Sequence, residues 1–138
     1  METIQFVMQF NAKLKGKEVS DSDKVDIIAN MLHVKKYISI REKLKLVKDI
    51  ISETVKYDNV TDKFIYNSFE KDLATIITLI KNYTDLNNFN ETSYDLLCSN
   101  SLLDYVIASF GKEYGIFLGV MNTYMQDLES KRISLEDM

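Results

Sequence analysis

The chain has 138 residues, with 17 Lys and Arg against 21 Asp and Glu and a formal net charge of −4. Its 46% hydrophobic and 28% charged residues are ordinary for a globular protein of one domain and exclude a disordered chain. The absence of proline and the presence of only four glycines disfavour a turn-rich sandwich or barrel, and a single cysteine excludes an intrachain disulfide.

The N-terminal third predicts three helices. Apolar residues in TIQFVMQFNAKL fit both the alternation of a strand and the spacing of a helix, and we favour a helix ended by Gly16 because no later segment offers a strand partner. The cluster Ser20–Asp23 supplies N-caps for a second helix that runs to about His33. Ser39, three residues before Glu42, forms a capping box that begins a third helix.

The middle of the chain predicts the core. The third helix is expected to run to about Tyr57, with an aliphatic stripe that belongs to the core: Ile40, Leu44, Val47, Ile51 and Val55. Val60 before Thr61, with Ile65 four residues after the threonine, is typical of a hydrophobic staple at a helix start. We therefore expect the longest helix, the centre of an Ile/Leu/Phe/Tyr core, over residues 62–83.

The last third predicts shorter helices and one long one. A loop over residues 84–93 is followed by a helical turn over 94–97, a break at 99–100, a helix over 101–110 that ends at Gly111, and a last helix over 112–130. Residues 131–138 are expected to form an exposed tail. The sequence thus predicts a single all-α domain, 1–138, built as one compact bundle of five or six helices with few or no strands.

The reactive side chains do not indicate an enzyme. His33 is expected at the surface or capping a helix C-terminus, and Cys98 beside Leu96 and Leu97 is expected as a buried thiol that acts as a small hydrophobe. Acidic pairs are more often solvated helix faces than acid/base or metal pairs. CxxC, P-loop, EF-hand and GxGxxG motifs are absent from the sequence. We therefore predict no catalytic residue, no metal site and no cofactor.

A basic cluster is the strongest positive feature. Arg41, Lys45 and Lys48 share one flank of the third helix, and Lys35 and Lys36 precede them. A row of this kind suits a phosphate backbone, but the acidic chain and the interleaved acids make nucleic acid the weaker interpretation. A solvated helix face and a protein-binding patch both stay open.

Two features suggest contact between subunits. Gly115 and Gly119 form a GxxxG pattern in a segment too short for a bilayer, so they allow another helix to approach closely, either inside the bundle or from another subunit. Residues 1–69 carry about two excess positive charges and residues 70–138 about six excess negative ones. Complementary halves of this kind suit a homo-oligomer assembled head to tail.

Three segments carry a resemblance. KKYISIREKLKLVKDII, IITLIKNYTDL and YDLLCSNSLLDYVI are similar in style to the small helical virion and assembly proteins of tailed bacteriophages. The resemblance implies a non-enzymatic head-tail adaptor, connector or assembly chaperone that contacts other protein subunits in the virion or host cytoplasm. Independently of it, the segment METIQFVMQF lacks the features of a signal peptide and the chain has no window of 18 uncharged apolar residues, so we expect no secretion and no membrane partner. The alternative is a small acidic regulatory binder that inhibits a host protein.

Overall fold

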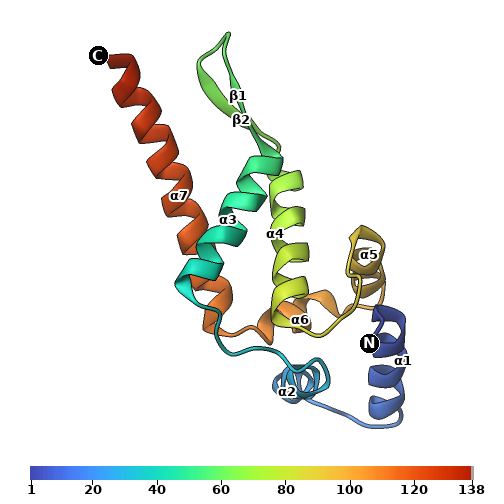
Figure 1. The fold of residues 1–138 in the computed structure, drawn as a ribbon. Coiled ribbons are helices and arrows are strands. Elements are labelled where there is room, and N and C mark those ends of the chain that lie inside the picture. Colours follow the sequence, from blue (N-terminus) through green and yellow to red (C-terminus); the bar gives the residue numbers. More distant parts are fainter. Residues whose placement is uncertain (138) are drawn as a thin grey trace. The chain divides into compact units, whose positions relative to one another are not determined.

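The computed structural model describes the backbone of residues 1–137 and the side chains of residues 1–130. The described part is mainly helical, with seven helices and two short strands (Figure 1). In chain order these elements are α1 Thr3–Leu14, α2 Asp21–Met31, α3 Ile40–Thr54, β1 Val55–Asp58, β2 Lys63–Tyr66, α4 Ser68–Tyr83, α5 Glu91–Ser99, α6 Leu103–Ala108 and α7 Lys112–Asp137. The mainly helical prediction is confirmed, and the number of helices exceeds the five or six predicted. The predicted exposed tail at 131–138 lies outside the side chains described.

The predicted helix starts in the N-terminal third are confirmed. The Ser20 hydroxyl accepts a hydrogen bond from the Asp23 amide and the Ser39 hydroxyl accepts one from the Glu42 amide, each at 3.2 Å. Each hydroxyl satisfies one of the amides that a helix start leaves without a partner. The first segment is helical, as favoured, and Gly16 follows it with φ +73°, a conformation that glycine adopts without strain.

The chain divides into two compact units. The first comprises Met1–Tyr37 with Ile76–Tyr114, and the second comprises Ile38–Thr75 with Gly115–Met138. The single domain predicted for residues 1–138 stays a prediction.

The first unit is held together by helix pairs. Helix α1 contacts α5, while α2 and α5 both contact α6. Its fully buried side chains come from every helix of the unit: Phe6, Ile28, Leu32, Leu79, Ile80, Tyr83, Leu97 and Val106. The Tyr83 and Phe110 rings lie 5.4 Å apart between centroids, a distance at which aromatic pairs stabilise a core.

The second unit is built on one face of α3 and one face of α7. Its buried apolar side chains include Val47, Ile50, Ile51, Phe117 and Met121. The residues repeat every three or four positions on each helix, so each helix contributes one continuous stripe.

The strands form a hairpin that the sequence interpretation missed. We expected α3 to continue to about Tyr57 and the next helix to begin near Asp62, but β1 and β2 pair antiparallel between them. The Val60 side chain is 93% exposed at the tip, so the predicted hydrophobic staple is wrong. The Asp58 carboxylate instead accepts hydrogen bonds from the Val60 amide at 3.0 Å and the Thr61 hydroxyl at 2.7 Å.

Cross-strand pairing explains why this segment leaves the helix. The Tyr57 and Phe64 side chains are paired across the hairpin, and their rings meet edge to face at 5.5 Å. Aromatic pairs of this kind stabilise two-stranded sheets, and aromatic residues are poor helix formers. The predicted core of residues 62–83 is therefore confined to the C-terminal part of α4, while Ile65 and Phe69 are 53% and 69% exposed.

Candidate functional site: a groove between two helices

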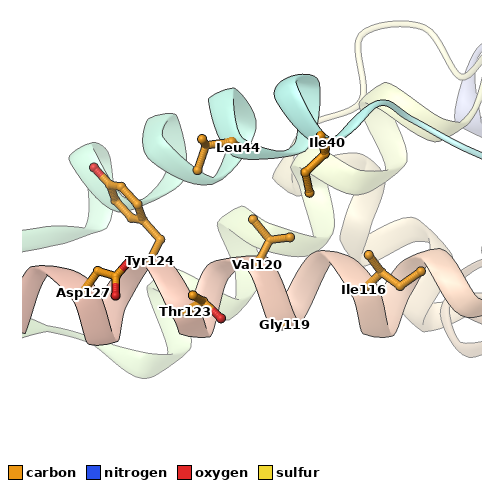
Figure 2. A pocket seen from close by; sticks show the side chains of 8 residues that line it. All are labelled: Ile40, Leu44, Ile116, Gly119, Val120, Thr123, Tyr124 and Asp127. Atoms are coloured by element: carbon orange, nitrogen blue, oxygen red, sulfur yellow. The ribbon is translucent and has the colours of Figure 1, made fainter.

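An open groove lies between α3 and α7 in the second unit. Figure 2 shows the α3 side chains pointing toward α7, and α7 side chains pointing back at them. The groove has a volume of about 510 Å³ and is lined by Ile40, Leu44, Ile116, Gly119, Val120, Thr123, Tyr124 and Asp127. Most of this lining is apolar, although it faces solvent.

Helix α7 forms its wall of the groove with a second apolar stripe. Its first stripe, Phe117 and Met121, is at most 3% exposed and packs into the core of the unit. One residue earlier in each turn, Ile116 and Val120 point into the groove instead, and Ile116 is 47% exposed. The apolar arc of α7 is wider than the part that the core buries, so the remaining apolar side chains face the groove.

Helix α3 forms the other wall with residues that the sequence predicts to lie in the core. Val47 and Ile51 of the predicted stripe are buried, but Ile40 is 58% exposed and Leu44 is 36% exposed. The prediction that the whole stripe belongs to the core is therefore wrong for its first half. Spacing places these four side chains on one arc, but only packing decides how much of the arc a neighbouring helix covers.

The two glycines of the GxxxG pattern meet no packed neighbour within the described residues. A Cβ atom added at Gly115 or at Gly119 would find nothing within 4 Å. Among the described side chains these glycines therefore provide no close packing, which is one of the two alternatives for this pattern. Gly119 lies in the lining of the groove, where the missing side chain leaves the α7 backbone accessible.

A basic row runs along α3 beside the groove. Arg41, Lys45 and Lys48 line a shallow hollow of about 280 Å³ together with Leu44 and Asp49. Leu44 also lines the groove, so the row and the groove are adjacent. None of the three basic side chains forms a salt bridge within residues 1–130, and all three are exposed. The shared flank predicted for them is confirmed.

Lys35 and Lys36 fall in a different unit from this row, so their predicted place beside it stays a prediction. They belong to the first unit, in the segment after α2, where the Lys35 amide donates a hydrogen bond to the Tyr83 carbonyl at 2.9 Å. Lys43, by contrast, lies between members of the row in sequence but is only 1% exposed. Its spacing from Val47 and Ile50 put it on the buried face, a signal that the sequence interpretation did not use.

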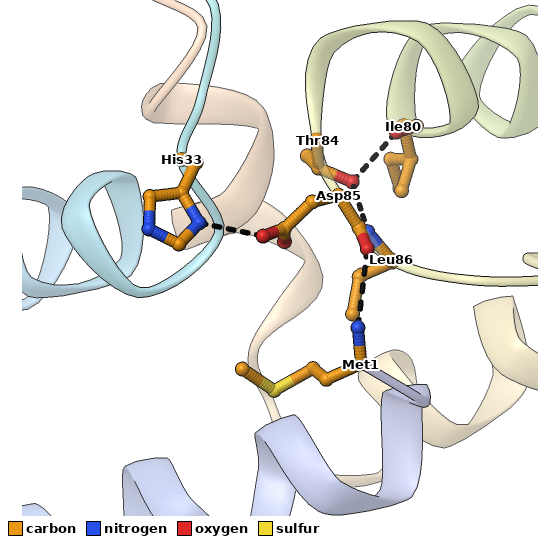
Figure 3. Close-up of polar contacts among 6 residues, drawn as sticks. All are labelled: Met1, His33, Ile80, Thr84, Asp85 and Leu86. Atoms are coloured by element: carbon orange, nitrogen blue, oxygen red, sulfur yellow. Dashed lines mark hydrogen bonds and ion pairs between the residues drawn. The ribbon is translucent and has the colours of Figure 1, made fainter.

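The single histidine ends a helix and joins a polar cluster in the first unit. His33 follows α2 with φ +48°, and its Nδ1 atom lies 2.6 Å from Asp85 Oδ2 (Figure 3). The Met1 amino group donates to the Asp85 carbonyl at 3.2 Å, and the Thr84 hydroxyl accepts from the Leu86 amide at 3.2 Å. The side chain of His33 is 79% exposed, which agrees with the predicted surface position at a helix end.

A second hollow includes His33 but not the other reactive groups. It is lined by Met1, Gln9, Ala12, Lys13, Asn30, Met31 and His33. Neither Cys98 nor a carboxylate is among these residues. The convergence of histidine, thiol and acid that would indicate nucleophilic catalysis is therefore not found in this hollow.

Cys98 is exposed, which corrects the prediction of a buried thiol. In α5 the buried position falls on Leu97, and the next residue turns toward solvent. Burial, together with the interaction with Cys98, raises the pKa of Tyr94 above its ordinary value. Among the described residues, no group of three or more His, Cys, Asp or Glu side chains is placed to hold a metal ion.

Comparisons with known proteins add no family to this description. No protein-family model, no curated protein and no solved structure matches the chain. In the part of the chain that the structure describes, every helix is too short or too polar to cross a membrane. The groove and the basic row are the surface features of the second unit that bear on function.

Proposed function

We propose that this chain works without catalysis, by protein–protein contact, as a bacteriophage structural or assembly protein such as a head-tail adaptor, connector or assembly chaperone. The phage role rests on the resemblance of its sequence segments. The contact itself is supported by one observation, the open apolar groove between α3 and α7.

Exposed apolar side chains support this proposal because they gather in one place. Ile40 and Ile116 are 58% and 47% exposed and face the same groove from opposite helices. Scattered apolar residues are ordinary on a protein surface, whereas a contiguous apolar groove with a polar rim is typical of a binding surface. Covering such a groove yields about 25 cal/mol for each Å² of apolar surface removed from water.

The proposal is tested with a charge placed in the groove. Ile116→Glu would put a carboxylate where a partner would bury apolar surface, so we expect it to abolish the contact. Ile4→Glu is the matched control, because Ile4 is similarly exposed, at 49%, but lies on α1 in the other unit. The measurement is quantitative co-purification of bound proteins from producing cells, together with molar mass by light scattering.

We expect specific partners, or additional copies of the chain, to be retained by the unaltered protein and by Ile4→Glu and lost with Ile116→Glu. Circular dichroism would verify that both variants fold. A protein that stays monomeric, with every bound protein unaffected by Ile116→Glu, would contradict the proposal. The predicted homo-oligomer would be supported by a larger mass that the groove substitution reduces to that of one chain.

A further inference from the structure

The shape of the groove indicates what kind of segment fits it. On α7 its lining extends from Ile116 to Asp127, which at a rise of 1.5 Å per residue is about 16 Å. On α3 it is lined by Ile40 and Leu44, one turn apart and facing α7 (Figure 2). Two helices with a channel between them present the surface that a third helix covers, with its own apolar stripe set against both. A segment of about three helical turns matches this length.

The absent side chain at Gly119 favours a helix that approaches closely. Because a Cβ atom at this position would meet nothing within 4 Å, the backbone of α7 is open to the groove there. Glycine at a helix contact lets two backbones come nearer than larger residues allow. Gly119 therefore leaves room for the backbone of the bound segment to lie close to α7.

The charges beside the groove indicate the chemistry of the partner. Arg41, Lys45 and Lys48 form the outer edge of the α3 wall, and Asp49 is the one acid in their hollow. None of the three is neutralised by a salt bridge within residues 1–130. An acidic side chain on the bound segment would lie next to this row, and opposite charges across an interface steer association and fix its register.

We infer that the groove binds an amphipathic helix of another protein, about three turns long, that carries acidic residues on the flank facing α3. This inference rests on the proposed function, because it requires that the groove be a protein contact. Beyond that function, the inference specifies the partner as an acidic amphipathic helix, which the apolar groove alone does not indicate.

A second copy of the chain fits this site less well. The exposed apolar side chains that a second copy would offer include Ile4 and Met8 on α1, a helix without acidic residues. They also include those of the α7 wall, whose groove residues contain a single acid, Asp127. One carboxylate would face three basic side chains. A nucleic acid would satisfy the basic row through phosphates, but it would leave the apolar lining of the groove in water.

The test uses two synthetic helical peptides of about four turns as probes. Both carry leucines at positions i, i+3, i+7 and i+10. The first has glutamates along one flank of that stripe, and the second has lysines at the same positions. Binding of each fluorescein-labelled peptide to the full chain is measured by anisotropy at low and at physiological salt. We expect the glutamate peptide to bind at least about tenfold more tightly, and the difference to shrink as salt screens the charges.

Charge reversal on the protein assigns the preference to the row. We expect the triple variant R41E/K45E/K48E to reverse it, so that the lysine peptide binds better. The control K13E/K15E/K17E changes the net charge of the protein by the same amount at exposed positions of the first unit and should leave the preference unchanged.

The outcomes separate this inference from the proposed function. If both peptides bind equally, and Ile116→Glu abolishes both, the groove is a helix-binding site and the acidic partner is wrong. If the lysine peptide or a labelled DNA duplex binds better to the unaltered chain, the inference is also overturned. Self-association that Ile116→Glu abolishes, without peptide binding, would assign the groove to a second copy. If neither peptide binds and no partner depends on the groove, both proposals fail.

Discussion

The Tyr83 hydroxyl donates a hydrogen bond to Glu113 Oε1 at 2.9 Å, and both side chains are buried. They bring the end of α4 to the start of α7 within the first unit. A buried carboxylate is tolerated only when hydrogen bonds replace the water it has lost. Substituting one member of this pair should therefore change the free energy of unfolding by a measurable amount.

Removing the hydroxyl should destabilise the protein. We expect Tyr83→Phe to lower the free energy of unfolding by about 1–3 kcal/mol, because Glu113 loses a donor while it stays buried. The matched control is Tyr105→Phe, which removes a hydrogen bond of 2.8 Å to Asp21 at a half-exposed position. Urea unfolding followed by circular dichroism measures both. If both variants lost the same free energy of unfolding, burial of the Tyr83 hydrogen bond would not explain the effect.

The same tyrosine should make stability depend on alkaline pH. Burial, and secondly Glu113, raise the pKa of Tyr83 well above its ordinary value of 10.0. In the unfolded chain this tyrosine ionises near pH 10, whereas in the folded protein it keeps its proton. The unfolded state then binds fewer protons, so stability is present below pH 10 and falls as the pH rises above it.

Tyr83→Phe should remove this dependence. We expect the stability difference between the unaltered protein and Tyr83→Phe to narrow from about pH 9 to about pH 11, by up to about 1.4 kcal/mol per pH unit above pH 10. Unfolding curves at several pH values measure the difference. Parallel stability profiles for the two proteins would show that Tyr83 ionises equally in both states.

Helix α5 ends at a strained serine that glycine should relieve. Ser101 has φ +58°, and the bonds from the Leu102 amide to the Leu97 carbonyl and from the Ser101 amide to the Cys98 carbonyl form a Schellman motif. Glycine adopts this left-handed conformation without the steric cost of a Cβ atom. We expect Ser101→Gly to raise the melting temperature, with a gain of about 0.5–1 kcal/mol. The control Ser99→Gly, at the last helical residue of α5, should lower it.

The thiol of Cys98 should react in the folded protein. Because its side chain is exposed, we expect a thiol-specific reagent such as 5,5′-dithiobis(2-nitrobenzoic acid) to modify it without denaturant. The control is the same chain in guanidinium chloride, where the thiol is fully accessible. If the thiol reacted only after unfolding, the result would support the buried position that the sequence predicts for Cys98.

Two valines of identical chemistry should respond differently to truncation. Val47 is fully buried in α3 and Val60 is 93% exposed at the hairpin tip. We expect Val47→Ala to cost about 1.5–3 kcal/mol through lost burial and the cavity it leaves, and Val60→Ala to stay within about 0.5 kcal/mol of the unaltered protein. A large loss at Val60 would instead favour the hydrophobic staple that the sequence predicted there.

Local chemistry in the sequence was sufficient to locate several helix boundaries. Ser20 and Ser39 cap the helices that follow them, as predicted, because capping depends on residues three positions apart. The basic flank of Arg41, Lys45 and Lys48 was also predicted correctly, since residues three and four apart share a face on any helix. These features follow from the helical repeat and need no knowledge of the partners.

Features that depend on distant residues required the tertiary structure. Aromatic pairing between Tyr57 and Phe64 turns a segment expected to be helical into a hairpin, because a cross-strand contact stabilises what local periodicity did not predict. Likewise the stripe of α3 was visible in the sequence, but its division into a buried half and an open half, at Ile40 and Leu44, was not. Periodicity determines which side chains share a face, and only the placement of other elements determines which of them are covered.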